Sequence, residues 1–299
     1  MTTPTAAPAT AAEALTGLAR IRPAGWLATP MPTDPATLLA RARQALAADH
    51  PGIDGRLTVI SARYTAAVFT VHRPDGADPL VLKLHADAAA YAGESLAYAL
   101  LNGTAPIARL HAEGDNSRSL LLEYLPEPAD WTSPKTPALL AGHVAAVHTA
   151  SLRLPGEAAQ AMNGFTTAAL LDAPAPAWIT GPAAYREVLA AHLDAYSPHL
   201  VPLGHLDLKP EHLRRRPGGD VVLLDVESVR PDVTGLIDLI TLPAVLRQAG
   251  HELAPARVLD LYLEATTAQG ARWTTDSLKT ALRAYAAATA LESLHGLDR

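Results

Sequence analysis

Cysteine is absent from the 299 residues, and its absence excludes disulfide bridges, thiolate metal ligands and cysteine nucleophiles. Long apolar stretches are missing as well: no run of about 18 apolar residues occurs, and the N-terminus lacks the basic and apolar regions of a signal peptide. The formal net charge of −6 is not the basic excess that nucleic-acid-binding proteins carry. The composition therefore predicts a soluble, cytoplasmic protein that binds neither membranes nor nucleic acid.

Lysine is scarce, because only four of the 24 basic residues are lysines (Lys83, Lys135, Lys209 and Lys279), which leaves 24 − 4 = 20 arginines. Arginine thus supplies the generic positive charge of this chain. A lysine that persists is a candidate for a task that needs a compact ammonium group. We interpret the one basic block, Arg214–Arg216, as a solvated turn.

The order of the hydrophobic patterns predicts two unequal parts. Residues 1–30, rich in alanine, threonine and proline at their start, are expected to be disordered or extended. The expected elements that follow are a helix at 34–49, strands at 56–64, 66–73 and 79–85, a helix at 86–103, and strands at 107–114 and 117–125. Residues 126–299 show mainly helical periodicity, with a short strand at 220–226. The sequence predicts an α+β fold, with an antiparallel-sheet lobe at 31–125 and a larger helical lobe at 126–299.

Two short segments combine acidic and basic residues at close spacing. "HLDLKPEH" (205–212) contains Asp207, and "LLDVES" (223–228) contains Asp225. The two aspartates are 225 − 207 = 18 residues apart, a separation that accommodates a loop, a short strand, a turn and a returning strand. We therefore expect both carboxylates at the mouth of one cleft.

These segments resemble two loops of the protein-kinase superfamily, in its aminoglycoside phosphotransferase and choline kinase branch. "HLDLKPEH" is similar to the catalytic loop and "LLDVE" to the metal-binding loop, and the resemblance extends over about residues 75–299. It implies the two-lobed protein-kinase-like fold and an ATP-dependent phosphotransferase with an alcohol group as acceptor. In that reaction Asp207 would accept or orient the hydroxyl proton, and Lys209 would reach the transferred phosphoryl group.

The resemblance also assigns binding roles. Lys83, in "VLKLH", would hold the α- and β-phosphates of ATP and would itself be held by Glu94. The backbone of Glu123, Tyr124 and Leu125 would receive the adenine edge. Asp225, with Glu227, would bind Mg²⁺ through carboxylate oxygens. Asp238, in "GLIDLI", would brace the catalytic loop.

Two features depart from the family pattern. The loop at 61–67, "SARYTAA", contains no glycine, so a glycine-rich phosphate flap is absent. His212 stands where the family has a metal-binding asparagine, and imidazole suits softer divalent ions than Mg²⁺. Either Glu227 takes over the second metal, which we favour from the sequence, or His212 is a ligand and Mn²⁺ is used.

The histidines also have other interpretations. His205 is interpreted as a structural core residue under the catalytic loop. His143 and His148 lie five residues apart on a helix and are expected to pack or cap rather than share a metal. A metal-hydrolase cluster of His205, Asp207 and His212 would need further histidine and carboxylate ligands that are not found nearby.

Three functions fit these observations. The first is phosphorylation of a small molecule such as an antibiotic, a sugar or another metabolite. Residues 236–299 carry seven acidic and six basic residues, and this net charge of −1 argues against a polycationic aminoglycoside. The second is phosphorylation of serine or threonine in a ribosomal precursor peptide, with a partner lyase. The third is a nucleotide-binding pseudokinase.

Overall fold

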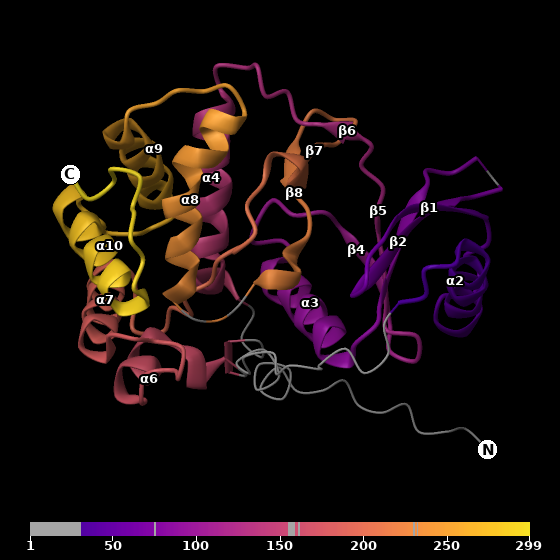
Figure 1. The fold of residues 1–299 in the computed structure, drawn as a ribbon, viewed down its shortest axis with the longest axis horizontal. Helices are drawn as coiled ribbons and strands as arrows, with labels where there is room; N and C mark the ends of the chain where they lie inside the picture. The colour runs from indigo at the N-terminus through magenta and orange to yellow at the C-terminus, as the bar shows by residue number, and fades with distance from the viewer. Residues whose placement is uncertain (1–30, 75, 155–158, 161, 230, 232) are drawn as a thin grey trace.

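A computed structural model describes residues 31–74, 76–154, 159–160, 162–229, 231 and 233–299. The N-terminal segment expected at 1–30 lies outside the described residues. Figure 1 shows a sheet with a flanking helix at one end of the molecule and a group of helices at the other. Within the described ranges, no helix has the combination of length and apolar character that a bilayer crossing requires.

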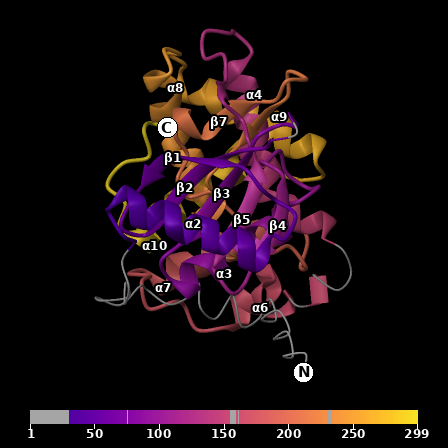
Figure 2. The same cartoon turned by 90° about the vertical axis from the view of Figure 1, so that its right-hand side faces the viewer.

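Five antiparallel strands form the sheet of the smaller lobe, in the order β1-β2-β3-β5-β4. Their bounds are β1 (Arg56–Ala62), β2 (Ala66–His72), β3 (Leu80–His85), β4 (Leu110–Gly114) and β5 (Ser119–Glu123). Helix α2 (Pro35–Asp49) lies across one face of this sheet (Figure 2). It begins after Asp34, whose carboxylate accepts a hydrogen bond from the backbone N–H of Thr37 and so caps the helix.

The strand alternation of β3 separates a core face from a cleft face. Leu82 and Leu84 are buried in one apolar cluster with Leu38 of α2, whereas Val81 and Lys83 line a cavity on the opposite face. Successive strand residues point to opposite faces, so the helix covers one side of the sheet and the other side is left for a ligand.

Helix α3 (Ala88–Leu101) links the two lobes. The carboxylate of Asp87 accepts hydrogen bonds from two backbone N–H groups of its first turn, and the helix ends before Gly103, whose φ of +71° suits glycine. Apolar residues of α3, including Leu96 and Leu101, belong to the core cluster of the larger lobe. The helix therefore carries its polar residues to the boundary between the lobes.

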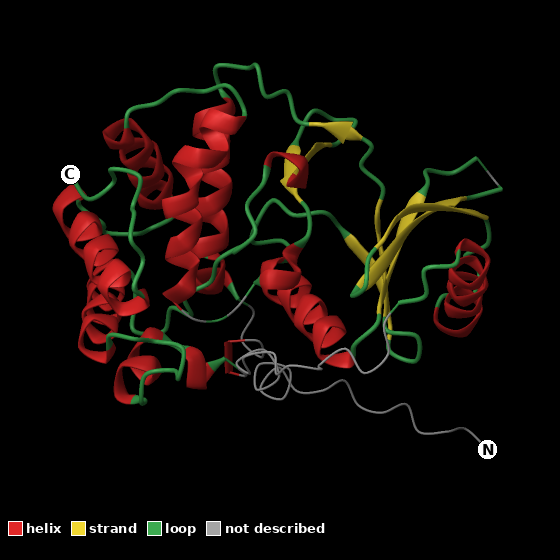
Figure 3. Cartoon of the chain, in the orientation of Figure 1, coloured by secondary structure: helices red, strands yellow, loops and turns green. Residues whose placement is uncertain are grey.

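The larger lobe is mainly helical (Figure 3). Its α-helices are α4 (Thr136–His148), α6 (Thr167–Asp172), α7 (Pro182–Ala195), α8 (Leu236–Gln248), α9 (Pro255–Ala268) and α10 (Thr275–Thr289). Short 3-10 turns are η1 (Ala150–Arg153), η2 (Asn163–Phe165), η3 (Pro210–His212), η4 (Val226–Ser228) and η5 (Val233–Gly235). A second antiparallel sheet joins β6 (Glu127–Pro128), β7 (Leu213–Arg215) and β8 (Val221–Leu223).

The α+β fold and the expected strands and helices of the smaller lobe are confirmed, with ends that differ by a few residues. The interpretation of Arg214–Arg216 as a solvated turn is wrong. Residues 213–215 form β7, which pairs with β8, and of the three arginines only Arg215 is exposed. A run of three charged residues does not show the apolar alternation that predicts a strand. Alternate side chains of this strand nevertheless point toward the protein.

Candidate active site

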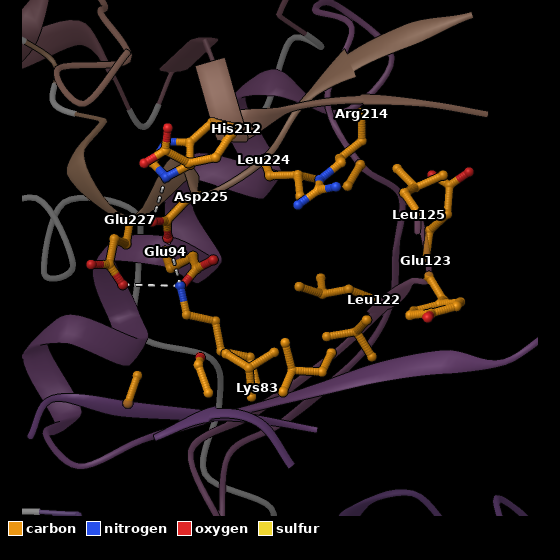
Figure 4. A pocket seen from close by; sticks show the side chains of 18 of the residues that line it. Lys83, Glu94, Leu122, Glu123, Leu125, His212, Arg214, Leu224, Asp225 and Glu227 are labelled. Carbon is orange, nitrogen blue, oxygen red and sulfur yellow. Dashed lines mark hydrogen bonds and ion pairs between the residues drawn. The ribbon is translucent and has the colours of Figure 1, made fainter. Parts of the chain in front are cut away.

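Lys83 lies at the centre of a buried ion cluster. Its Nζ atom lies 2.8 Å from a carboxylate oxygen of Glu94, 2.9 Å from Asp225 and 2.9 Å from Glu227. The side chains of Lys83 and Glu94 are 8% and 1% exposed, so the lysine–glutamate pair expected from the sequence forms away from water. Figure 4 shows the cluster at one end of a pocket, where β3, α3 and the segment after β8 meet.

The charges of this cluster support one another. Burial lowers the pKa of Lys83, but Glu94, Asp225 and Glu227 outweigh it and hold that pKa well above its usual value. Burial likewise raises the pKa values of Glu94 and Asp225, but the Lys83 ammonium outweighs it and both pKa values fall below the usual range. Three carboxylates surround one ammonium, and this excess of negative charge attracts a further cation.

The loop that carries Asp207 is braced from α8. The carboxylate of Asp238, which is 1% exposed, accepts hydrogen bonds from the backbone N–H groups of His205 and Leu206. His205 is also buried, and its Nε2 atom lies 2.8 Å from the carbonyl oxygen of Leu224. The expected brace from Asp238 and the expected burial of His205 under this loop are both confirmed, and the His205 Nδ1 atom has no hydrogen-bond partner among the described residues.

A close approach of two glycines brings this loop against the start of α8. A Cβ atom on Gly204 would lie 2.1 Å from the Cα atom of Gly235. No other residue fits at that distance, because the obstacle is backbone. This contact lets Asp238 reach the loop that precedes Asp207.

Asp207 and Lys209 form an ion pair that water can reach. The Lys209 Nζ atom lies 2.8 Å from the Asp207 carboxylate, and the two side chains are 44% and 34% exposed. The hydrogen bond from Lys209 to Asp207 raises the pKa of the lysine. Both groups are thus positioned at an accessible surface, as a reacting base and its neighbouring cation require.

Asp207, His212 and Asp225 bring three possible metal ligands together, since one donor atom from each lies within 4.8 Å of the others. The His212 Nε2 atom lies 3.5 Å from the Asp225 carboxylate, and Nδ1 lies 2.9 Å from the Asp207 carbonyl oxygen. A proton on Nδ1 can bond to that carbonyl, which leaves the Nε2 lone pair facing Asp225. The convergence of Asp207 and Asp225 expected from the sequence is confirmed.

These residues fit a divalent cation. Burial lowers the pKa of His212, although Asp225 opposes this, so the imidazole is neutral at pH 7 and can donate its lone pair. Carboxylate oxygens suit Mg²⁺ and Mn²⁺, whereas an imidazole nitrogen favours Mn²⁺ and later metals. The Asp225 backbone has a left-handed φ of +59°, which aspartate tolerates better than most residues.

Glu227 lies with a different group. Its Oε2 atom contacts Lys83, and its carboxylate clusters with His85 and Glu94 rather than with Asp207 and His212. This arrangement favours His212 over Glu227 as a further metal ligand, the reverse of the preference drawn from the sequence. The assignment of either residue to a metal remains a prediction.

A cavity of about 530 Å³ extends from this cluster to the segment that joins the lobes. Its other end is bounded by Glu123–Pro126, Leu122 and Leu224, and the apolar side chains of Val68, Val81 and Ala108 also line it. The segment expected to receive the adenine edge therefore lines the apolar end. The Glu123 carboxylate is held by Arg216, at 2.8 Å, and by the backbone N–H of Arg109, and the Glu123 backbone N–H donates to the Arg109 carbonyl oxygen.

Two residues of the site were not found by sequence reasoning. His85, 1% exposed, lies 3.0 Å from Glu94 through Nε2, and its position two residues after Lys83 on a strand was the available signal. Arg214 lines the apolar end of the cavity. It was missed because its segment was interpreted as a turn.

Comparison with solved structures identifies the fold. The chain is similar to an aminoglycoside phosphotransferase from Alicyclobacillus acidocaldarius, with 16% identity, a TM-score of 0.51, and coverage of 86% of this chain and 83% of that one. It is also similar to an ethanolamine kinase from Plasmodium vivax, with 11% identity, a TM-score of 0.49, and coverage of 77% and 71%. No protein-family model and no curated protein matches the chain.

The fold is protein-kinase-like. The resemblance of the two loop motifs to the aminoglycoside phosphotransferase and choline kinase branch agrees with the architecture of the solved relative. In this kinase-like fold the sheet of the smaller lobe and the loop at 205–212 of the larger lobe both contribute residues to one cavity.

Proposed function

We propose that this protein is an ATP-dependent phosphotransferase that moves the γ-phosphoryl group to a hydroxyl of a small molecule. The observation that carries the proposal is that Lys83 contacts Asp225 at one cavity, while Asp207, accessible to water, has a carboxylate oxygen within 4.8 Å of the Asp225 carboxylate. The kinase-like fold supports it, because phosphoryl transfer depends on positioning and charge neutralisation more than on covalent chemistry by the protein.

Each residue has a distinct task in the transfer. The acceptor oxygen forms a bond to the γ-phosphorus, the bond from phosphorus to the β,γ-bridging oxygen breaks, and ADP leaves with that electron pair. Asp207 accepts the hydroxyl proton, and Lys209, bonded to it, stabilises the charge that develops on the phosphoryl oxygens. Lys83 orients the α- and β-phosphates. Asp225 and His212 would hold a divalent cation, which neutralises phosphate charge when bound.

The larger lobe supports an acceptor without high positive charge. Helices α8, α9 and α10 lie in residues 236–299, whose seven acidic and six basic residues nearly cancel. A polycationic acceptor would be matched by a clear acidic excess. We therefore expect a sugar, an antibiotic or another hydroxylated metabolite of low charge.

The test is transfer of labelled phosphate from ATP, in Mg²⁺ or Mn²⁺, to panels of hydroxylated metabolites and antibiotics and to serine-containing peptides. Mass spectrometry should find one added phosphate on a small molecule with the wild-type protein. Asp207→Asn should bind ATP but transfer phosphate roughly 10²–10⁴-fold more slowly.

Two outcomes contradict the proposal in different ways. Phosphate on peptides alone would identify a peptide kinase, with a lyase as the expected partner. If the wild-type protein binds ATP but transfers phosphate to no acceptor, and Asp207→Asn behaves in the same way, the protein is a nucleotide-binding pseudokinase.

A further inference from the structure

Arg214 occupies the apolar end of the cavity. It lies on β7 opposite Val222 of β8, and Val222 packs in an apolar cluster with Ala108 and Leu125. Ala108, Leu125 and Arg214 all line the cavity. Figure 4 shows the Arg214 side chain reaching into the open space, on the other side of that space from Lys83.

The position of this guanidinium is set by the protein while its charge is left unpaired. One nitrogen donates to the carbonyl oxygen of Pro126, 3.2 Å away, in the segment that joins the lobes. Among the described residues no carboxylate forms an ion pair with Arg214, in contrast to Arg216, which pairs with Glu123. The planar group is therefore oriented by a neutral acceptor, and its faces remain available.

Aliphatic side chains of the smaller lobe line the same cavity as Arg214. Val68 and Val81 line the cavity, and both belong to the sheet of the smaller lobe. A flat, hydrogen-bonding ligand at this end would lie between aliphatic side chains and a planar cation. The guanidinium group stacks on the faces of aromatic rings and of nucleic-acid bases, so the two walls suit a heteroaromatic ring.

We propose that the Arg214 guanidinium stacks on the base of the donor nucleotide and favours purines, whose fused rings offer the larger face. This inference rests on the proposed function, since it names a contact within the same nucleotide site. The triphosphate would lie at the other end, beside Lys83 and the Asp225 carboxylate. Arg214 is then a specificity-determining residue that does not touch the phosphates.

Calorimetric titration of the full-length protein tests this assignment without requiring turnover. The ligands are a non-hydrolysable ATP analogue, UTP and inorganic tripolyphosphate, each with Mg²⁺. Arg214→Met keeps an unbranched chain but removes the planar charge, and Arg214→Lys keeps the charge but loses the plane. Arg215→Met is the matched control, because Arg215 is exposed on the same strand.

We expect Arg214→Met to lower the affinity for the ATP analogue about tenfold and to leave the affinity for tripolyphosphate unchanged. The ratio of the affinities for the ATP analogue and UTP should become smaller. The affinity of Arg214→Lys for the ATP analogue should lie between those of Arg214→Met and the wild type. Arg215→Met should have the wild-type affinity. Circular dichroism and the melting temperature verify that each variant is folded.

Three results overturn the inference. Equal losses for the ATP analogue and tripolyphosphate would make Arg214 a phosphate ligand, and unchanged affinities would leave it without a binding role. In both cases nucleotide binding by the wild type keeps the proposed function intact. A wild-type protein that binds no nucleotide would refute the proposed function as well.

Discussion

Lys83 and Lys209 belong to the same site and each pairs with a carboxylate, yet the two pairs differ in their access to water. Lys83 and Glu94 are 8% and 1% exposed, whereas Lys209 and Asp207 are 44% and 34% exposed. Removing one partner of a buried pair leaves an uncompensated charge, and removing one partner of an exposed pair leaves a hydrated one. The Lys83–Glu94 pair is therefore expected to affect both ligand binding and the stability of the fold. The Lys209–Asp207 pair is expected to affect the reaction and not the stability.

The largest effect is expected when the buried pair is broken. Lys83→Met should lower the free energy of unfolding by about 3–5 kcal/mol, because Glu94 loses its ammonium partner. Without that partner burial raises the pKa of Glu94, so the deficit should grow as pH rises from acid to neutral. Urea denaturation at several pH values measures this.

The matched control for that variant is Lys209→Met, which should cost less than about 1 kcal/mol. If Lys83→Met and Lys209→Met lose similar amounts of unfolding free energy, burial does not make the first ion pair more important for stability than the second.

Removal of the exposed Asp207 carboxylate should lower the rate of phosphoryl transfer and leave the stability of the fold nearly unchanged. Asp207→Asn should lower the transfer rate by roughly 10²–10⁴-fold and change the free energy of unfolding by no more than about 0.5 kcal/mol. Steady-state kinetics and urea denaturation on one preparation test these two expectations, and an ATP titration tests whether ATP binding is kept. A loss of ATP binding or a large loss of stability would place Asp207 with the structural residues.

The contrast between buried and exposed groups extends to the histidines of the larger lobe. Burial lowers the pKa of His192 to about 4, against a hydrogen bond to the Val188 carbonyl. The folded-state pKa is below the ordinary 6.5, so the unfolded state binds a proton first as pH falls. Stability should decrease between about pH 6.5 and 4, by up to about 3 kcal/mol from this group.

The measurement is the pH slope of the unfolding free energy in His192→Gln and in the wild type. The slope should be shallower in His192→Gln. His199→Gln, at an exposed position of the same region, should keep the wild-type slope, and an identical slope in all three proteins would argue against the assignment.

The smallest effect is expected at the two candidate metal ligands, His212 and Glu227. His212→Asn should lower the affinity for Mn²⁺ relative to Mg²⁺ by no more than about tenfold, or ~1.4 kcal/mol, because an amide oxygen replaces an imidazole nitrogen. Electron paramagnetic resonance of bound Mn²⁺, with Mg²⁺ as competitor, reports the ratio. Glu227→Gln should leave the ratio unchanged. A shift in Glu227→Gln alone would restore the assignment that the sequence favoured.

Local patterns were sufficient for the elements of the smaller lobe. The alternation in "PLVLKLH" identified β3 and placed Lys83 on one of its faces, and the Asn-Gly pair identified the end of α3. The strand at 213–215 escaped prediction because consecutive arginines carry no apolar alternation. Its pairing with β8 depends on partners elsewhere in the chain, and tertiary contacts commonly override local preference in strands.

By itself the sequence determined the α+β organisation, the catalytic-loop and metal-loop motifs and the expectation that Asp207 and Asp225 meet, because each of these depends on residues close together along the chain. Tertiary structure alone decided that Lys83 contacts three carboxylates, with Asp225 and Lys83 separated by 142 residues. It also decided that the Glu227 carboxylate contacts Lys83, and that Arg214 lines the cavity. Contacts between distant segments follow from how the lobes pack, and no local spacing encodes them.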